Sequence, residues 1–266
     1  MIFVVDIGNT NIVASVFDDD KILCQWRIAT DTKRTSDEYA SIIFSLIRDN
    51  NLKQDDFSSS IISSVVPDLI GAFVTVCTRL CGKKPFIVTA AMVNDGTLPV
   101  QMPFENNEVG SDLICNAVSA WKMFGKANIV VDFGTALSTI CTDSKGIIRG
   151  VTITPGLGTA VHSLSSNTAQ LPTVPLVAPK NSLGLNTVTA IQSGIVLGYK
   201  GLVEYLVKQI KTDLAATVGE NPDEIVVVAT GGLNSVLKPI TDCFTIVDKD
   251  LTVKGLKAIF DILNKK

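Results

Sequence analysis

Residues 4–9 read Val-Val-Asp-Ile-Gly-Asn, and residues 130–135 read Val-Val-Asp-Phe-Gly-Thr, 126 positions later. Each stretch is a short apolar run that predicts a buried strand, followed by an Asp-x-Gly turn. A single Asp-x-Gly is a weak indication, because aspartate and glycine are ordinary turn residues. Two copies at one offset, which Ile22 and Ile148 continue downstream, predict two related halves. Each half would read strand, turn, strand, turn, strand.

The rest of the chain alternates short apolar runs with helical periodicity. We expect further strands near residues 12–17, 22–28, 61–62, 86–88, 138–142 and 225–228. Apolar stripes bounded by caps or glycines predict helices near residues 36–48, 67–81, 111–124, 187–219 (one or two helices) and 253–264. Such alternation predicts an α/β fold in which helices cover sheets. We expect the two halves to span residues 1–115 and 116–266.

The composition argues against several classes of protein. Hydrophobic residues make up 46% of the 266 residues and charged residues 18%, which is not the composition of a disordered chain. The 23 basic and 26 acidic side chains argue against a nucleic-acid partner. No apolar run approaches the roughly 18 residues of a membrane helix, so we expect no membrane partner. Six scattered cysteines and a single histidine, His162, form no zinc-site pattern, and we expect reduced thiols in a cytoplasmic protein.

The two turns carry groups that suit a phosphate. Glycine lets backbone N–H groups approach a phosphate closely, and neighbouring hydroxyls and amides add donors. The carboxylates of Asp6 and Asp132 would hold cations that bridge phosphate oxygens between the halves. The side chains expected to add donors are Asn9, Thr10, Asn11, Thr135, Ser138 and Thr139.

Two such hairpins around a nucleotide resemble the layout of the actin, Hsp70 and hexokinase-like ATPases. The resemblance implies a duplicated ribonuclease H-like fold, with mixed sheets flanked by helices. Residues 225–232 fit it, because a buried strand there runs into Gly231-Gly232, where a flat adenosine could approach closely. A plain strand-to-helix turn explains this stretch equally well. The chain has no Gly-x-x-x-x-Gly-Lys-Ser/Thr sequence, which excludes a P-loop.

Asp112 is the candidate catalytic base. Transfer of a phosphoryl group from ATP to a hydroxyl needs a carboxylate that accepts the proton. Asp112 follows Gly110-Ser111 and opens a predicted helix, where the helix dipole favours the ionised carboxylate. An ordinary first-turn aspartate is the competing interpretation, and position alone favours it.

These motifs, taken in order, resemble the type III pantothenate kinases over nearly the whole chain. Each motif is modest, and their joint pattern is highly specific. The matching stretches are residues 6–11, 62–67, 108–112, 131–136, 154–156, 186–187, 192–194, 229–232 and 250–252.

The resemblance implies ATP-dependent phosphorylation of pantothenate, the first step of coenzyme A biosynthesis. It implies that Asp112 is the proton acceptor, that Thr135 contacts ATP, and that Asp132 binds a monovalent cation, K⁺ or NH₄⁺. It also implies Mg²⁺ with ATP, and a homodimer in which Thr187 reaches the pantothenate of the partner subunit. The phosphate loop would consist of Asp6, Ile7, Gly8, Asn9, Thr10, Asn11, Ile12 and Val13, and the pantothenate-binding segment of Gly110, Ser111, Asp112 and Leu113.

Two positions depart from the family pattern. Leu113 stands where the family usually has arginine, and Pro103, followed by Phe104, stands where the family has tyrosine. An arginine can bind a carboxylate with two hydrogen bonds, whereas leucine offers none. Two alternatives therefore stay open. One is a non-catalytic nucleotide-binding relative that acts as a transcription accessory factor, and the other is a kinase of this fold for another small alcohol.

Overall fold

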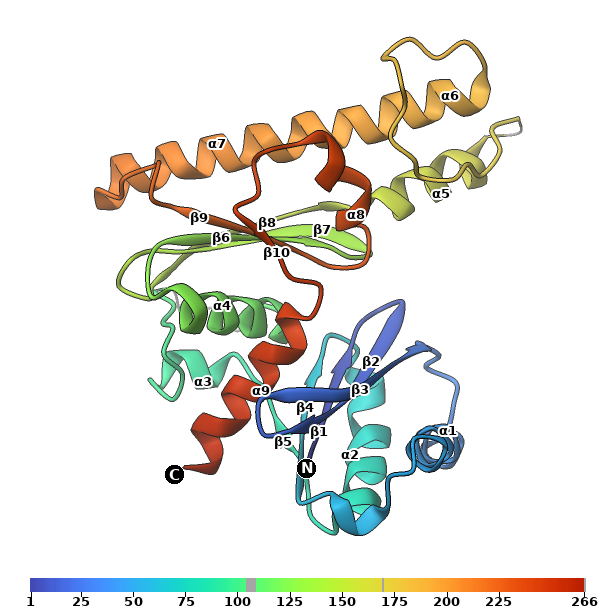
Figure 1. Cartoon of the computed structure of the whole chain (residues 1–266), viewed down its shortest axis with the longest axis vertical. Coiled ribbons are helices and arrows are strands. Elements are labelled where there is room, and N and C mark those ends of the chain that lie inside the picture. The colour runs from blue at the N-terminus through green and yellow to red at the C-terminus, as the bar shows by residue number, and fades with distance from the viewer. Residues whose placement is uncertain (104–108, 169, 266) are drawn as a thin grey trace. The chain divides into compact units, whose positions relative to one another are not determined.

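The computed structural model describes residues 1–103, 109–168 and 170–265 and forms two compact units (Figure 1). Unit 1 comprises Met1–Lys122 and Leu251–Lys266, and unit 2 comprises Met123–Asp250. The expected division at residues 115 and 116 differs from these units in two respects. It falls inside helix α4 (Ser111–Phe124), and it assigns helix α9 (Leu251–Asn264) to the second half, whereas α9 packs within unit 1.

Unit 1 contains a five-stranded mixed sheet in the order β3-β2-β1-β4-β5. β1, β2 and β3 form an antiparallel meander, and β4 and β5 run parallel to their neighbours. In this arrangement Asp6 at the end of β1 lies opposite Val13 of β2 and beside Ser63 of β4. The strands are β1 (Ile2–Ile7), β2 (Asn11–Asp18), β3 (Lys21–Ala29), β4 (Ser59–Ser64) and β5 (Phe86–Ile87).

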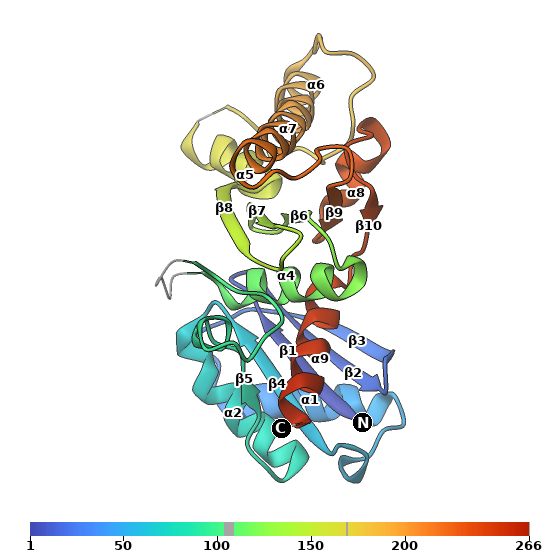
Figure 2. The same ribbon diagram turned by 90° about the vertical axis from the view of Figure 1, so that its left-hand side faces the viewer.

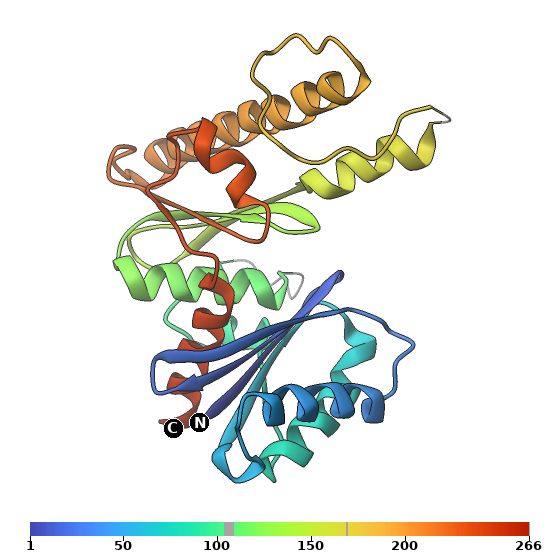
Figure 3. The same cartoon turned by 45° about the vertical axis from the view of Figure 1, so that its right-hand side comes forward.

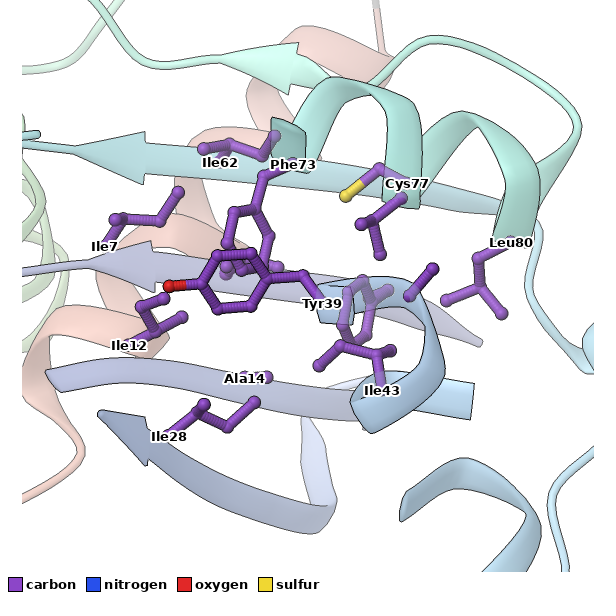
Figure 4. Close-up of a cluster of buried hydrophobic side chains, with 14 of the residues drawn as sticks. Ile7, Ile12, Ala14, Ile28, Tyr39, Ile43, Ile62, Phe73, Cys77 and Leu80 are labelled. Atoms are coloured by element: carbon purple, nitrogen blue, oxygen red, sulfur yellow. The ribbon is translucent and has the colours of Figure 1, made fainter. Parts of the chain in front are cut away.

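Helices cover both faces of this sheet, with α1 (Ser36–Asp49) and α2 (Pro67–Cys81) on one face and α9 on the other (Figure 2). α1 begins with a capping box between Thr35 and Glu38. The core under α1 and α2 is apolar, and the rings of Tyr39 and Phe73 lie 4.8 Å apart within it (Figure 4). This burial anchors the strands whose ends carry the candidate site.

Helices α4 and α9 of unit 1 pack closely together. A side-chain carbon at Gly255 of α9 would collide with the backbone carbonyl of Cys115 in α4, so only glycine allows this approach. Thr252 Oγ1 also donates a hydrogen bond to Asn116 Oδ1 at 2.8 Å. The apolar periodicity of α9 predicts a helix but does not say which sheet the helix covers. The close contact between Gly255 and the Cys115 backbone of α4 holds α9 in unit 1.

Unit 2 repeats the sheet of unit 1. Its strand order is β10-β9-β6-β7-β8, with β6 to β8 antiparallel and β9 and β10 parallel to their neighbours. Matching β6 to β1 reproduces the order of unit 1 strand for strand, which confirms the predicted mixed sheets and their repetition. The strands are β6 (Asn128–Phe133), β7 (Ala136–Thr142), β8 (Ile148–Pro155), β9 (Val226–Thr230) and β10 (Ile246–Val247).

A long helical run covers one face of this second sheet (Figure 3). It comprises α6 (Thr187–Gln192), a π-helical turn (Ser193–Leu197) and α7 (Gly198–Val218), where one or two helices were predicted. Helix α5 (Leu157–Asn167) packs against it through Val161 and was not predicted. The shorter helical segments are Gln54–Asp56, α3 (Ala91–Asn94), α8 (Asn234–Leu237) and Lys238–Ile240. Within the described residues, no helix is both long enough and apolar enough to span a bilayer.

Candidate active site

The first predicted phosphate turn lies at the tip of the β1–β2 hairpin. The Gly8 N–H donates to the Asn11 carbonyl at 3.0 Å, which leaves Asn9 and Thr10 exposed at the tip. A side-chain carbon at Gly8 would lie 3.0 Å from the same carbonyl oxygen, so glycine keeps this backbone open. The side chains of Ile7 and Ile12 are wholly buried, and these two predicted loop residues can meet a ligand only through their backbone.

Thr30, the residue that follows β3, holds this turn. Its backbone N–H donates to the Thr10 carbonyl at 3.0 Å, and its Oγ1 donates to the Gly8 carbonyl at 2.6 Å. Sequence reasoning did not single out Thr30. The tip is therefore fixed from the side by the third strand.

Asp112 stands at the start of α4, which is fastened to the end of β4. Ser111 Oγ lies 2.9 Å from Ser63 Oγ, accepts the Ser64 N–H at 3.0 Å and donates to the Ser64 carbonyl at 3.1 Å. This hydroxyl, expected to belong to the substrate-binding segment, thus positions the helix that carries Asp112. Because Ser63 is the neighbour of Asp6 in the sheet, α4 begins beside the strand end that carries the first turn.

Gly110 lies immediately before this helix, in contact with the side chain of Asp112. A side-chain carbon at Gly110 would lie 2.5 Å from Asp112 Oδ1, so the carboxylate folds back over residue 110. The Leu113 N–H donates to the same Oδ1 at 2.8 Å. Gly110 and Leu113 thus act on the orientation of the carboxylate.

Burial raises the pKa of Asp112 above its usual value, while the hydrogen bond from the Leu113 N–H lowers it. The expectation that the helix start favours the ionised form describes the smaller of these effects. Burial also raises the pKa of the Cys115 thiol, and the negative charges of Asp6 and Asp112 raise it further. Both carboxylates therefore lie within electrostatic reach of Cys115.

The two departures from the family pattern lie in this unit. The Leu113 side chain is only 6% exposed, so it packs in the core. Pro103 lies in a bend and is exposed. Phe104, which follows Pro103, and Glu108, in the matching stretch 108–112, lie outside the residues that the structure describes.

The second turn, at the tip of the β6–β7 hairpin, is shorter. The Gly134 N–H donates to the Ala136 carbonyl at 3.1 Å, and only Thr135 lies between these two residues at the exposed tip. The expected donor Thr139 is buried, with its hydroxyl 2.8 Å from that of Thr152, so it does not serve this tip. Ser138 lies opposite Asp132 in the strand pairing.

The Gly231-Gly232 pair ends β9 against this turn. Gly231 has φ +86°, and a side-chain carbon there would lie 2.5 Å from Asp132 Oδ1 and 2.6 Å from the Phe133 backbone. Glycine therefore meets both a conformational and a steric requirement. Asp132, Gly134 and Gly231 come together in unit 2.

The residue after β8 and a residue of α5 hold the second tip, and a residue of α7 holds the end of β8. The Thr135 carbonyl accepts the Gly156 N–H at 2.9 Å and Thr159 Oγ1 at 2.7 Å. The Tyr199 hydroxyl donates to the Pro155 carbonyl at 2.6 Å. Sequence reasoning missed Thr159 and Tyr199, because it did not predict α5 or the turn that joins it to β8.

Thr187 opens α6, where the Asn186 side chain caps the helix by accepting the Thr189 N–H at 2.9 Å. Thr187 is exposed, and so are the neighbouring Leu183 and Leu185, at 80% and 94%. The segment that carries these leucines is well held. Gly184 packs against the Ala190 backbone, which leaves no room for a side-chain carbon.

No group of three or more histidine, cysteine or carboxylate side chains in the described part of the chain could hold a metal ion. Asp6 lies near the end of β1 and Asp132 near the end of β6, so each turn has one carboxylate beside it that could contact a cation. Mg²⁺ commonly binds through one or two carboxylates together with phosphate oxygens and waters. That mode suits turns that bind a nucleotide.

Comparisons with known proteins agree along the chain. A family model described as Type III pantothenate kinase matches residues 2–209. The type III pantothenate kinase of Exiguobacterium sibiricum is 37% identical over 261 residues, which cover 98% of this chain and 99% of that protein. The type III pantothenate kinase of Finegoldia magna is 37% identical over 270 residues, which cover 100% of this chain and 98% of that protein.

Solved structures with lower identity share the fold. A Campylobacter jejuni protein described as a Baf family transcriptional activator has a TM-score of 0.58 at 17% identity, covering 99% of this chain and 100% of that chain. The ethanolamine utilization protein EutJ from Carboxydothermus hydrogenoformans has a TM-score of 0.53 at 14% identity, covering 97% and 89%. Such identities bear on the fold alone, and they agree with the predicted α/β fold of two repeated mixed sheets flanked by helices. With a family model matched over residues 2–209 and relatives 37% identical over nearly their whole length, the chain belongs to the type III pantothenate kinase family.

Proposed function

We propose that this chain transfers the γ-phosphoryl group of ATP to pantothenate, the first step of coenzyme A biosynthesis, with Asp112 as general base. Membership of the family supports the reaction. The observation that carries the role of Asp112 is its placement. Ser111 fastens α4 to the end of β4, which puts the carboxylate of residue 112 near the strand end that bears Asp6.

The reaction needs one proton acceptor and no covalent intermediate. Asp112 takes the proton of the primary hydroxyl as its oxygen attacks the γ-phosphorus, and ADP leaves with the electrons of the broken P–O bond. The backbone of residues 6–13 and Thr135 bind phosphate oxygens. Only the ionised form of Asp112 can accept the proton, so the raised pKa places the acid limb of activity above the usual range of an aspartate.

Two cations fit the carboxylates of the turns. Mg²⁺ would bind with ATP and neutralise charge on the phosphates. We propose that Asp132 binds a monovalent cation, K⁺ or NH₄⁺, because its carboxylate is held against Gly231 at the base of the second turn. If a monovalent cation binds at Asp132, the kinase activity should rise with KCl and not with NaCl at constant ionic strength.

Residues 110–113 are the proposed pantothenate-binding segment. Leu113 packs in the core and cannot replace the two hydrogen bonds of an arginine. Loss of one charged hydrogen bond weakens binding by about ten- to a hundredfold unless another group replaces it. We therefore expect a high KM for pantothenate with full phosphoryl-transfer chemistry.

We propose a homodimer in which Thr187 reaches the pantothenate site of the partner subunit. Exposed apolar side chains that lie together in one patch mark surfaces that bind another protein. Leu183 and Leu185 lie close to Thr187 in the chain. Two contacts hold their segment: Gly184 packs against α6, and the Ser193 hydroxyl donates to the Ser182 carbonyl. Leu185→Asp should shift the protein towards monomer in sedimentation and raise the KM for pantothenate. An unchanged sedimentation coefficient would exclude this surface.

The six free cysteines support a reducing compartment, and we place the reaction in the cytoplasm. Three of them, at residues 77, 115 and 141, are buried. Burial raises the pKa of each of these three thiols, which keeps them protonated.

A coupled assay of ADP release with ATP, Mg²⁺, K⁺ and pantothenate tests the function. Asp112→Asn should lower kcat by about a hundredfold or more, the usual contribution of general-base catalysis. Asp68→Asn is the matched control, since Asp68 also lies in the first turn of a helix and is exposed. A folded wild-type protein that releases no ADP with pantothenate, or an Asp112→Asn variant as active as the control, would contradict the proposal. ADP release with another small alcohol alone would identify a different acceptor.

A further inference from the structure

The two turns are held in the same way from the residue that follows the third strand. In unit 1, the Thr30 N–H donates to the Thr10 carbonyl at 3.0 Å, and in unit 2 the Gly156 N–H donates to the Thr135 carbonyl at 2.9 Å. Residues 30 and 156 are 126 positions apart, the offset of the aspartates. The contact therefore belongs to the repeated unit and is not a chance packing of one loop.

The side chains at these two positions differ. Thr30 uses its hydroxyl to bind the Gly8 carbonyl at 2.6 Å. At Gly156, a side-chain carbon would collide with the Gly134 carbonyl and lie 2.6 Å from the Thr135 carbonyl oxygen, so no hydroxyl fits there. Thr159, in the first turn of α5, supplies one instead, and its Oγ1 donates to the Thr135 carbonyl at 2.7 Å.

Tyr199 holds the peptide that donates to this turn, the one that joins the Pro155 C=O to the Gly156 N–H. Its hydroxyl donates to the Pro155 carbonyl at 2.6 Å, and Tyr199 is the second residue of α7, which follows the π-helical turn after α6. Burial raises the pKa of Tyr199, so its hydroxyl stays a donor throughout the neutral range. Short π-helical segments within helices are often found at functional sites.

We propose that Thr159 and Tyr199 are positioning residues for the nucleotide: they fix the peptide at Thr135 and thereby the direction of the N–H groups that this tip presents to ATP. The C=O of Thr135 and the N–H of Ala136 belong to one trans peptide, so holding the carbonyl fixes the N–H that points the opposite way. The inference rests on the proposed function, in which this tip binds phosphate. It predicts an effect on ATP and none on pantothenate.

The first test compares Thr159→Val with Thr159→Ser. Valine removes the hydroxyl at nearly constant shape, and the KM for ATP should rise about three- to tenfold, as expected for one neutral hydrogen bond. The KM for pantothenate and the melting temperature should not change, and serine should restore the wild-type KM. Thr212→Val is the matched control, because the Thr212 hydroxyl donates to the Lys208 carbonyl on the exposed face of α7.

The second test is Tyr199→Phe, with Tyr205→Phe as control on the same helix, where Tyr205 is 63% exposed. Tyr199→Phe should raise the KM for ATP by a smaller factor than Thr159→Val, since Tyr199 acts through Pro155. An unchanged KM for ATP in both variants, an equal rise for both substrates, or failure of serine to restore Thr159→Val would overturn the inference.

Direct binding separates this inference from the proposed function. The affinity for ATP is measured by calorimetry without pantothenate, on the wild type and each variant. If the wild type phosphorylates no pantothenate but Thr159→Val still weakens ATP binding, the acceptor assignment fails and the inference stands. If ATP binds Thr159→Val as tightly as the wild type, the inference fails whatever the acceptor is.

Discussion

The two hairpins look alike in sequence but differ at their tips. Two residues, Asn9 and Thr10, lie between the paired Gly8 and Asn11, whereas Thr135 alone lies between Gly134 and Ala136. The second strand of unit 2 is therefore offset by 125 positions from its counterpart, not 126. The following turn restores the offset, since Phe17 pairs with Ile22 and Thr142 with Ile148.

This difference shows that the paired strands, not the turns, are the repeated element. The strand order and the placement of the aspartate at the strand end survive a shift of one residue, because the next turn absorbs it. The tips are then free to differ. The longer tip is held by one side chain, Thr30, and the shorter one by Gly156 and Thr159 together.

We expect the largest effect from a substitution of Gly156, the residue of unit 2 that corresponds to Thr30 of unit 1. Gly156→Ala would push a carbon into the Gly134 carbonyl, and neither backbone segment can yield cheaply. We expect a loss of about 1–3 kcal/mol in the free energy of unfolding, measured with urea, and a rise of at least about tenfold in the KM for ATP. Gly150→Ala, in the preceding strand β8, has open space around the added carbon and serves as the control. Equal effects of the two substitutions would refute the steric argument.

A smaller effect is expected in unit 1. Thr30→Val removes the hydrogen bond to the Gly8 carbonyl but keeps the backbone bond to Thr10. The KM for ATP should rise about three- to tenfold, and Thr30→Ser should restore it. If Thr30→Val and Thr159→Val raise the KM for ATP by similar factors, the hydroxyls of Thr30 and Thr159 have equivalent roles in the two turns. An unchanged KM for ATP in Thr30→Val would mean that the β1–β2 turn keeps its conformation without the Thr30 hydroxyl.

The smallest expected effect concerns stability and pH at Asp112. Burial raises its pKa in the folded state, so the folded protein binds the proton more tightly than the unfolded chain does. Binding of this proton stabilises the folded protein fully at pH values below the pKa of an aspartate in the unfolded chain, about 3.9. The stabilisation is lost as the pH rises through the pKa of Asp112 in the folded protein. Asp112→Asn should therefore match the wild type in acid and melt slightly higher at neutral pH. A variant that melts lower at neutral pH would show that the carboxylate stabilises the fold.

Much of this molecule could be predicted from local patterns. Apolar runs ending in Asp-x-Gly indicated the ends of β1 and β6, and the stripe after Ser111 indicated α4 with Asp112 in its first turn. These features depend on neighbouring residues, so they are readable without the fold. Helix α5 was missed because glycine and several serines in Leu157–Asn167 are weak helix formers.

The sequence by itself determined the repeated strand, turn and strand, and the residue types that suit phosphate and proton transfer, because strand and turn preferences are local. Only the tertiary structure decided what holds each tip, and where α9 packs. Thr10 and Thr30 meet because β3 pairs with β2, and Thr135 and Thr159 meet because α5 starts under the tip. Such contacts join residues about twenty positions apart in the chain, and a hydrogen bond at that separation exists only once the sheet has set the distance.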